Sequence, residues 1–230
     1  MTFETYLIRV WLPDRPGALG LVASRLGALR GDVQGLEIVE RSGGRAIDEL
    51  VVRLPADVPI ELIAREVSAE DDVEVEDIRL LEGTQYDPQL DILEAAAILL
   101  GSASRDDLAQ ALAEHVRRCV RTSWTCVLDQ EDPRLEEGTL VGASGAHPSP
   151  GWLSSFVAGS PANQDLESDV DTVWIPLPSA RAALVVGRST VLRARERQRL
   201  AALARIADAW FRRLGEHATL EALLLHPSRS

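Results

Sequence analysis

The sequence predicts an α+β protein that consists of two successive parts. In the first part, strands and helices alternate in the order β-α-β-β-α-β, which gives a sheet with two helices on one face. Three patterns support this class: residues 5–12 alternate between apolar and polar, apolar residues recur every three or four positions over 19–29, and residues 193–214 show a longer helical pattern. A polar stretch at 83–89 suits a linker between the two parts.

The overall composition restricts the class of protein. The chain has 230 residues, of which 46% are hydrophobic and 26% charged, as in ordinary folded proteins. The net charge is −12 and no lysine occurs, and an acidic balance without a basic stripe argues against a nucleic-acid partner. No apolar run is long enough to cross a membrane, and the N-terminus shows no secretory pattern. We therefore expect a cytoplasmic protein without a membrane partner.

Local patterns predict each element of the first part. Pro16 suits the first turn of a helix, and Gly31 suits its C-terminal end. Pro59 opens a second, shorter helix, and a glycine pair before Arg45 suits a hairpin turn. In chain order, the expected elements are a strand over 5–12, a helix between Pro16 and Gly31, strands over 33–41 and 46–54, a helix over 60–67 and a strand over 73–80.

The segment Asp14–Leu19 is the most informative one, because it joins the first strand to the first helix. Gly17 has no Cβ, so a ligand or a second backbone can approach it closely. The N–H groups of Ala18 and Leu19 fall in the first helical turn, where they can hold a carboxylate. Arg15 can pair with the same carboxylate through two hydrogen bonds. The segment therefore predicts a site for a small anion.

Two interpretations of Asp14 are open from the residues alone. Its carboxylate can accept hydrogen bonds from a ligand ammonium group, or it can cap the following helix. In the second case, Gly17 is there only because the packing requires it, and the segment need not bind a ligand.

The motif Asp14-Arg15-Pro16-Gly17-Ala18-Leu19, within this order of elements, resembles the ACT domain, a ferredoxin-like fold, over residues 4–82. The step Gly31-Asp32-Val33 resembles the small-residue turn of that family, which often has asparagine in place of Asp32. The resemblance implies a domain over 1–82 that binds an amino acid or a similar metabolite between two such domains, although many members serve in assembly. The implied ligand-binding residues are Asp14, Arg15, Pro16, Gly17, Ala18 and Leu19, with Asp32, Val33 and Gln34 facing them.

The second part combines helices with several short strands and is expected to cover 90–214, followed by a helical tail over 215–230. Ser104 is a suitable N-cap, because two aspartates follow it in the first turn of a helix. In chain order, the expected elements are helices over 90–100 and 106–120, strands over 122–129 and 140–143, a helix over 151–157, strands over 172–177 and 182–187, and a helix near 193–214.

Three of these elements resemble parts of the GAF domain. They are the strands 173–177 and 183–188 and the helix that carries Glu196, Leu200, Leu203 and Ala204. The resemblance implies a GAF- or PAS-like sensor fold, with an antiparallel sheet, packed helices and often a small-molecule cavity. The chain departs from the family at 179–182, where the hairpin glycine is replaced, and in the short middle of the domain. It identifies no ligand, because we find neither a bilin-type cysteine nor a cyclic-nucleotide motif.

Other residues with possible chemistry have simpler interpretations. Trp124, Trp152 and Trp174 can line a cavity, but packing in the core is the favoured interpretation. Cys126 is expected to be a small buried side chain rather than a nucleophile. His115 lies on an apolar helix stripe and is expected to pack there rather than to bind a metal.

We expect no catalytic residue, no metal site and no cofactor, because the P-loop, GxSxG, HExxH and dinucleotide motifs are missing. The favoured function is a regulatory sensor that binds an amino acid or a similar metabolite through its ACT-like domain and carries a GAF-like signalling domain. The alternatives are a ligand-independent dimeric subunit that regulates a partner protein, and an enzyme whose groups converge from distant positions. We expect a homodimer or a higher homo-oligomer, because edge strands pair readily. The identity of the ligand is not predicted.

Overall fold

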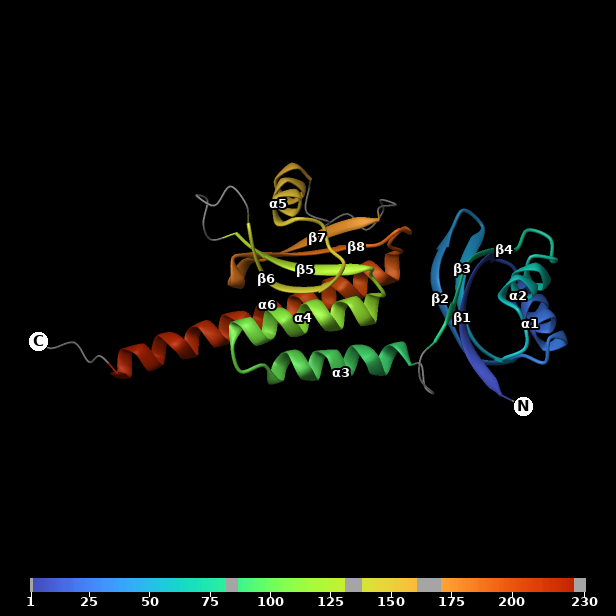
Figure 1. Cartoon of the computed structure of the whole chain (residues 1–230), viewed down its shortest axis with the longest axis horizontal. Helices are drawn as coiled ribbons and strands as arrows, with labels where there is room; N and C mark the ends of the chain where they lie inside the picture. Colours follow the sequence, from blue (N-terminus) through green and yellow to red (C-terminus); the bar gives the residue numbers. More distant parts are fainter. Residues whose placement is uncertain (1, 82–86, 131–137, 161–170, 226–230) are drawn as a thin grey trace, which may run out of the picture. The chain divides into compact units, whose positions relative to one another are not determined.

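The computed structural model describes residues 2–81, 87–130, 138–160 and 171–225, with side chains as far as residue 217. The chain divides into two compact units, Met1–Asp87 and Pro88–Ser230 (Figure 1). The boundary falls inside the predicted linker 83–89, of which residues 83–86 lie outside the described residues. Each unit has its own sheet and its own core.

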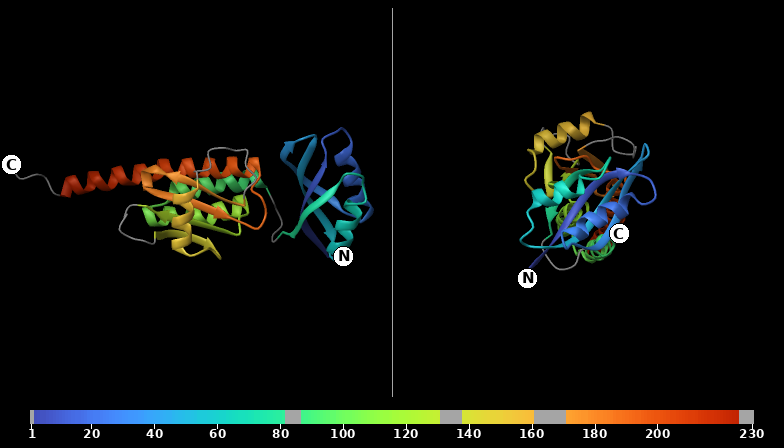
Figure 2. Two further views of the ribbon diagram at one scale, coloured as in Figure 1. Left: turned by 90° about the horizontal axis from the view of Figure 1, so that it is seen from above. Right: turned by 90° about the vertical axis from the view of Figure 1, so that its right-hand side faces the viewer.

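The first unit is a four-stranded antiparallel sheet with both of its helices on one face (Figure 2). The strand order is β2-β3-β1-β4, so β1 and β3 are central and β2 and β4 form the edges. This confirms the predicted β-α-β-β-α-β order. The elements are β1 (Phe3–Pro13), α1 (Ala18–Ala28), β2 (Asp32–Ser42), β3 (Arg45–Pro55), α2 (Ile60–Val67) and β4 (Glu74–Leu80).

The core of the first unit lies between the sheet and the helices. The alternation in β1 places every second side chain under the helices, and these side chains are Tyr6, Ile8, Val10 and Leu12. One apolar stripe of each helix meets them, as the helical spacing predicts. The stripes and the matching residues of β3 are Ala18, Val22, Leu26, Ile63, Val67, Ala46, Leu50, Val52 and Leu54.

Helix α1 ends where the sequence predicts, but the residue in the left-handed conformation is Arg30, with φ 62°, rather than Gly31. The N–H groups of Arg30 and Gly31 donate to the carbonyls of Gly27 and Leu26, both at 2.9 Å, which closes the helix. Gly31 is needed for space, because a Cβ there would lie 2.8 Å from the Leu26 carbonyl oxygen.

The second unit is also built on a four-stranded antiparallel sheet, with the strand order β6-β5-β8-β7. Helices α3, α4 and α6 cover one face and α5 covers the other (Figure 1). The predicted antiparallel sheet with packed helices is therefore present. The elements are α3 (Pro88–Gly101), α4 (Arg105–Val120), β5 (Trp124–Asp129), β6 (Thr139–Gly145), α5 (Pro150–Gly159), β7 (Thr172–Leu177), the 3₁₀ turn η1 (Pro178–Ala180), β8 (Ala182–Gly187) and α6 (Ala194–Leu225).

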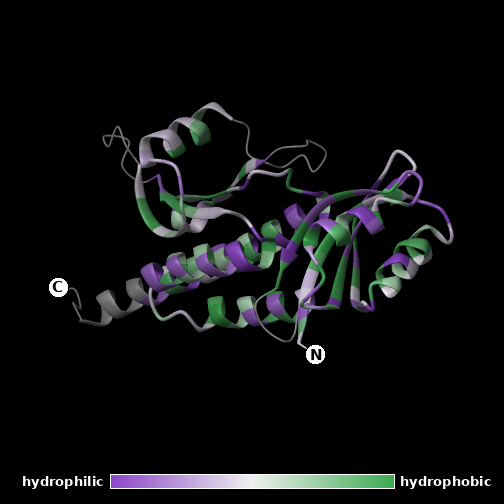
Figure 3. Ribbon diagram, turned by 45° about the vertical axis from the view of Figure 1, so that its right-hand side comes forward, coloured by the Kyte–Doolittle hydropathy of each residue, from purple (hydrophilic) through white to green (hydrophobic). Residues whose placement is uncertain are grey.

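Helix α6 continues through Gly215 as far as Leu225, so the helical tail predicted over 215–230 is an extension of the closing helix up to that residue. Polar and apolar bands alternate along the helices of this unit (Figure 3), as expected for helices that bury one face. The N-cap prediction for Ser104 is confirmed, because its Oγ accepts a hydrogen bond of 3.1 Å from the Asp107 N–H.

A buried ion pair joins the end of β8 to the first turn of α6. Arg188 donates from Nη1 to Glu196 Oε1 at 2.7 Å and from Nη2 to Glu196 Oε2 at 2.5 Å. Glu196 Oε2 also accepts a hydrogen bond of 2.8 Å from the Arg193 N–H, which caps the helix. Both charged side chains are almost fully buried, and each provides a counter-charge for the other.

Glu196→Gln should destabilise the second unit, because the substitution leaves the buried Arg188 guanidinium without its counter-charge. We expect a loss of about 3 kcal/mol in the free energy of unfolding, measured by denaturant titration. Glu216→Gln is the control, because Glu216 lies exposed on the same helix and should change stability by less than about 0.5 kcal/mol. Equal stability of the two variants would contradict this role of the ion pair.

Candidate functional site

The turn between β1 and α1 is exposed and holds its glycine in an unusual conformation. Gly17 is the N-cap of α1, with φ 90°, and no side chain caps the helix. A Cβ built on Gly17 would meet no atom within 4 Å, so close packing does not require a glycine here. The positive φ favours glycine instead, because a residue without a Cβ adopts it without strain. The helix begins at Ala18, so Pro16 precedes the first turn instead of lying in it.

The interpretation that Asp14 caps α1 is wrong. The Asp14 N–H donates to the Gly44 carbonyl at 2.9 Å, which ties the turn to the β2–β3 hairpin. Its carboxylate lies 3.7 Å from the Arg41 Nε, and both side chains are largely exposed. The Asp14 carboxylate therefore stays at the surface of the turn, where a ligand can reach it.

The first N–H groups of α1 differ in whether they donate a hydrogen bond to a backbone carbonyl. The Ala18 N–H donates to the Arg15 carbonyl at 3.3 Å, and the Leu21 N–H donates to the Gly17 carbonyl at 3.1 Å. For Leu19 and Gly20, no backbone acceptor is found within the described part of the chain. The donors available to an anion are thus those of Leu19 and Gly20, whereas the sequence suggested Ala18 and Leu19.

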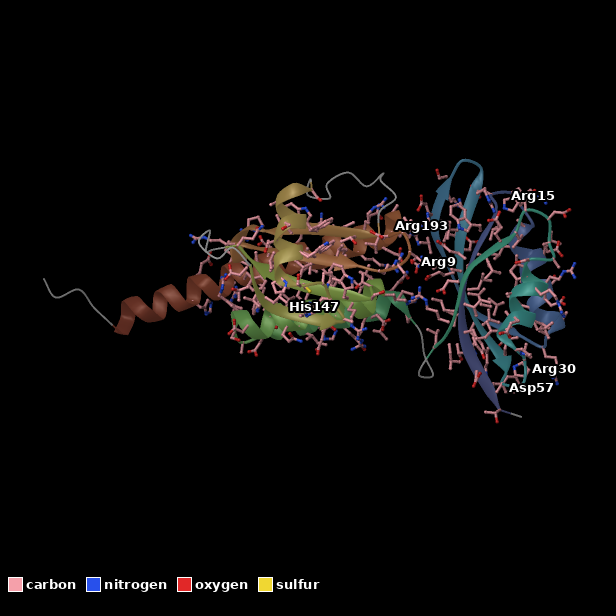
Figure 4. The ribbon with its side chains drawn as sticks, turned by 45° about the horizontal axis from the view of Figure 1, so that its top comes forward. Arg9, Arg15, Arg30, Asp57, His147 and Arg193 are labelled. Carbon is pink, nitrogen blue, oxygen red and sulfur yellow. The ribbon has the colours of Figure 1, made fainter. Side chains whose placement is uncertain are left out.

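Arg15 is exposed, and no ion pair joins it to another described residue. It lies at the end of the first unit opposite to Arg30 and Asp57 (Figure 4). These two residues form a loose pair, with 3.9 Å between Nη2 and Oδ2. Arg15 is therefore the cation of the turn that is available for a ligand carboxylate, while Arg30 offers a matched comparison far from it.

The structure does not bring Asp32, Val33 and Gln34 to the turn within one chain. Asp32 pairs with Arg53, and Arg53 pairs with Thr5 at the start of β1, eight residues before the end of that strand. At about 3.3 Å per residue, the two ends are about 26 Å apart. All three residues are exposed on the edge strand β2. They can complete the site only if a second copy supplies them.

The structure adds one residue that the sequence analysis missed. Asp48 lies in β3 opposite Val10, on the face that the helices cover, and only 3% of it is exposed. Its Oδ1 has no hydrogen-bond partner. Burial raises the pKa of the Asp48 carboxyl, Arg41 nearby lowers it, and Asp14 raises it further. The sequence does contain a signal for Asp48, because it occupies one of the alternating positions of β3 that face the helices. The other residues at these positions are the apolar Ala46, Leu50, Val52 and Leu54.

Trp124 and Trp174 pack against the core between the sheet and α5, whereas 45% of Trp152 is exposed. Trp124 meets Trp152 edge-on, with 6.4 Å between ring centroids. The Trp124 ring also lies so close to Gly187 that a Cβ there would be 2.3 Å from it. The Trp174 Nε1–H donates to the Ser160 carbonyl at 3.1 Å. The core interpretation therefore agrees with the packing of Trp124 and Trp174, but it is wrong for Trp152, which is exposed.

The cysteine and histidine candidates also have structural roles. Cys126 is fully buried, and burial raises the pKa of its thiol to about 12, so it stays protonated at neutral pH. Burial also lowers the pKa of the half-buried His115, with a smaller effect in the same direction from Arg118. Among the described residues, no group of three or more acidic, histidine or cysteine side chains could hold a metal ion.

A shallow groove of about 290 Å³ runs between α6 and the end of β7. Its lining includes Arg205 and Arg212, both exposed, beside apolar residues of β7 and α6. Asp208 also lines it but accepts hydrogen bonds from the Ser179 N–H and hydroxyl, at 2.8 and 3.0 Å. The groove is a weaker candidate than the turn, because surface arginines alone do not define a ligand. No helix in the described ranges is long and apolar enough to cross a membrane.

Comparison with known proteins gives only remote similarities. No family model matches the sequence, and no curated protein matches it. The GAF domain of an Acinetobacter phosphoenolpyruvate-protein phosphotransferase is 14% identical, with a TM-score of 0.39 over 55% of this chain and 94% of that chain. The chromophore-binding domain of the R. palustris bacteriophytochrome RpBphP3 is 12% identical, with a TM-score of 0.39 over 93% and 95%.

A formyltetrahydrofolate deformylase from Pseudomonas putida KT2440 is 17% identical, with a TM-score of 0.27 over 41% of this chain and 38% of that chain. Similarities at this level do not assign the chain to a family.

Asp48→Asn should stabilise the first unit at pH 7, because it removes a buried charge. The raised pKa means that the folded state holds its proton more tightly than the unfolded state, so stability falls as pH rises from about 3.9, the ordinary aspartate pKa, through the raised value. We expect the variant to gain about 1 kcal/mol at pH 7, and the gain to shrink toward pH 3.

Denaturant unfolding between pH 3 and pH 8 measures this difference. Arg41 and Asp14 face the Asp48 carboxyl and stay unchanged in the variant. Asp57→Asn is the control, since Asp57 is exposed and its removal should give no pH-dependent gain. A destabilised Asp48→Asn at pH 7 would show that the carboxylate is satisfied in the folded protein.

Proposed function

We propose that the chain is a cytoplasmic regulatory protein whose first unit binds an amino acid or a similar small metabolite at the turn Asp14–Leu19. One observation carries this proposal: among the described residues, no side chain caps the N-terminus of α1, and no backbone carbonyl accepts from the N–H groups of Leu19 and Gly20. A ligand carboxylate supplies the missing acceptor, and the helix dipole favours its charge. The resemblance of the turn to the ACT domain supports the same class of ligand.

The charges around the turn suit a ligand that carries both a carboxylate and an ammonium group. Arg15 is exposed and can pair with the carboxylate beside the helix N-terminus. Asp14 can accept from the ammonium group, because its ion pair with Arg41 is long and exposed and therefore weak. A ligand with both groups can engage both sides of the turn at once.

A homodimer would complete the site. The edge strand β2 has unpaired backbone groups on its outer side and exposes Val33 and Leu36. A two-fold antiparallel pairing of two β2 strands places the start of one against the end of the other. It would bring Asp32, Val33 and Gln34 of one copy next to the turn Asp14–Leu19 of its partner.

We assign the second unit the role of a GAF-like signalling domain without catalytic activity of its own. The resemblance in β7, β8 and the start of α6 supports this role. The Arg188–Glu196 pair also supports it, because it anchors the start of a single helix that extends to Leu225. A helix held firmly at one end can transmit a small displacement along its length.

Arg15→Ala should weaken ligand binding, whereas Arg30→Ala should not. We expect at least one of the twenty amino acids to release heat on binding to the wild-type protein in calorimetry, and Arg15→Ala to lower its affinity about tenfold or more. Arg30 is the matched control, because it lies at the opposite end of the unit (Figure 4).

Two results would contradict this function. One is that no amino acid binds the wild-type protein, and the other is equal weakening by both arginine substitutions. A protein partner captured equally well with and without amino acids would instead support the ligand-independent regulatory subunit.

Leu36→Asp should shift a dimer toward monomers, because it adds a charge to the exposed edge of β2. We expect the wild-type protein to have twice the chain mass of 25.1 kDa in size-exclusion chromatography with light scattering. Leu21→Asp is the control, since Leu21 is equally exposed but lies on α1. A wild-type protein that elutes as a monomer at all concentrations would rule out the dimer.

A further inference from the structure

Asp48 is an exception in the core of the first unit. It is the one charged residue at the helix-facing positions of β3, between Ala46 and Leu50 on its own strand. The register with β1 determines the face of the sheet on which the Asp48 side chain lies, because Asp48 is opposite Val10, which belongs to the buried core. The chain thus holds a carboxylate where its neighbours are apolar.

Burial without a partner makes this carboxylate costly to keep. Only 3% of Asp48 is exposed, and its Oδ1 has no hydrogen-bond partner. Arg41 is a cation that acts on it electrostatically, but the Arg41 Nε also lies 3.7 Å from the Asp14 carboxylate. Proteins rarely bury a carboxylate without pairing it, and a site with such a group is a candidate for binding.

The carboxylate lies beneath the turn rather than elsewhere in the core. Ala18 opens α1 and belongs to the same buried cluster as Val10 and Ala46, which flank Asp48. Asp14 in the turn and Arg41 near the end of β2 both act on the Asp48 carboxyl electrostatically. Asp48 therefore lies on the buried side of the turn that leads into α1.

We propose, on the basis of the ligand site proposed above, that the primary ammonium group of the ligand binds the Asp48 carboxylate at the inner end of this site, with the Asp14 carboxylate on its outer side. The ligand carboxylate then lies outward, at the N–H groups of Leu19 and Gly20. This arrangement gives the site a direction, with the cation inside and the anion at the surface. It favours amino acids and amines over carboxylic acids of the same size that lack nitrogen, because only the former neutralise Asp48.

The turn allows such a ligand to enter. Gly17 has open space around it, no side chain caps α1, and the Asp14–Arg41 contact is long. The hydrogen bond from the Asp14 N–H to the Gly44 carbonyl holds the start of the turn, whereas the side of the turn at Gly17 is open. Entry of an ammonium group would also supply the partner that Oδ1 lacks.

Calorimetry with Asp48→Asn and Asp57→Asn tests this assignment. The probes are the twenty amino acids, propionate as the nitrogen-free counterpart of alanine, and the amines methylammonium, ethanolamine and putrescine. We expect Asp48→Asn to weaken amino-acid binding at least tenfold, and Asp57→Asn to leave it unchanged. A titration of the Asp48 carboxyl by NMR should show a lower pKa when the wild-type site is saturated with the bound amino acid.

The outcomes separate this assignment from the proposed function. Amino acids that bind Asp48→Asn as tightly as the wild-type protein would overturn the role of Asp48 and leave the function standing. If no amino acid binds the wild-type protein, the proposed function fails, and the amines decide the role of Asp48. Amine binding that Asp48→Asn abolishes would support it, and binding of no amine would overturn it. Unfolding curves of each variant confirm that it is folded.

Discussion

The register of β1 against β3 is the constraint on which the first unit depends. The two strands pair over their full lengths, from Phe3 opposite Pro55 to Pro13 opposite Arg45. Because side chains alternate between faces, a slip of one residue would turn Asp48 away from the helices. The same register places the end of β1 beside the β2–β3 hairpin, where the Asp14 N–H binds the Gly44 carbonyl. This pairing therefore determines the positions of the turn, the buried Asp48 carboxylate and the edge strand β2.

The second unit depends on a different kind of constraint. Its sheet is covered on both faces, so β8 is buried along its whole length and contributes to two cores. The long helix α6 must then start at a defined point beyond β8, and Arg188 and Glu196 define that point from the two sides of the connection.

Local patterns predicted the elements of both units well, because periodicity and caps are local properties. The alternation in β1, the stripe of α1 and the cap at Ser104 needed only neighbouring residues to be recognised. The errors come from tertiary structure. Nothing near Asp14 shows that its N–H is used by Gly44 and its carboxylate is left near Arg41.

The site could be predicted only in part for the same reason. The turn was evident from Gly17 and its neighbours, but the separation of Asp32 from it required the strand register. Asp48 was missed because its burial can be recognised only once it is known which face of β3 the helices cover. Arg30 likewise takes the left-handed conformation that a glycine was expected to adopt, since Gly31 is needed where the chain passes close to Leu26.

The most direct measurement is the change in backbone amide NMR shifts when an equimolar mixture of the twenty amino acids is added to the labelled protein. If the turn is the binding site, the amides of Leu19 and Gly20 should move most, followed by those of Asp48 and its neighbours in β3, and the amides around the groove at Arg205 and Arg212 should stay in place. Saturable shifts confined to the second unit, or no shifts at all, would contradict the account.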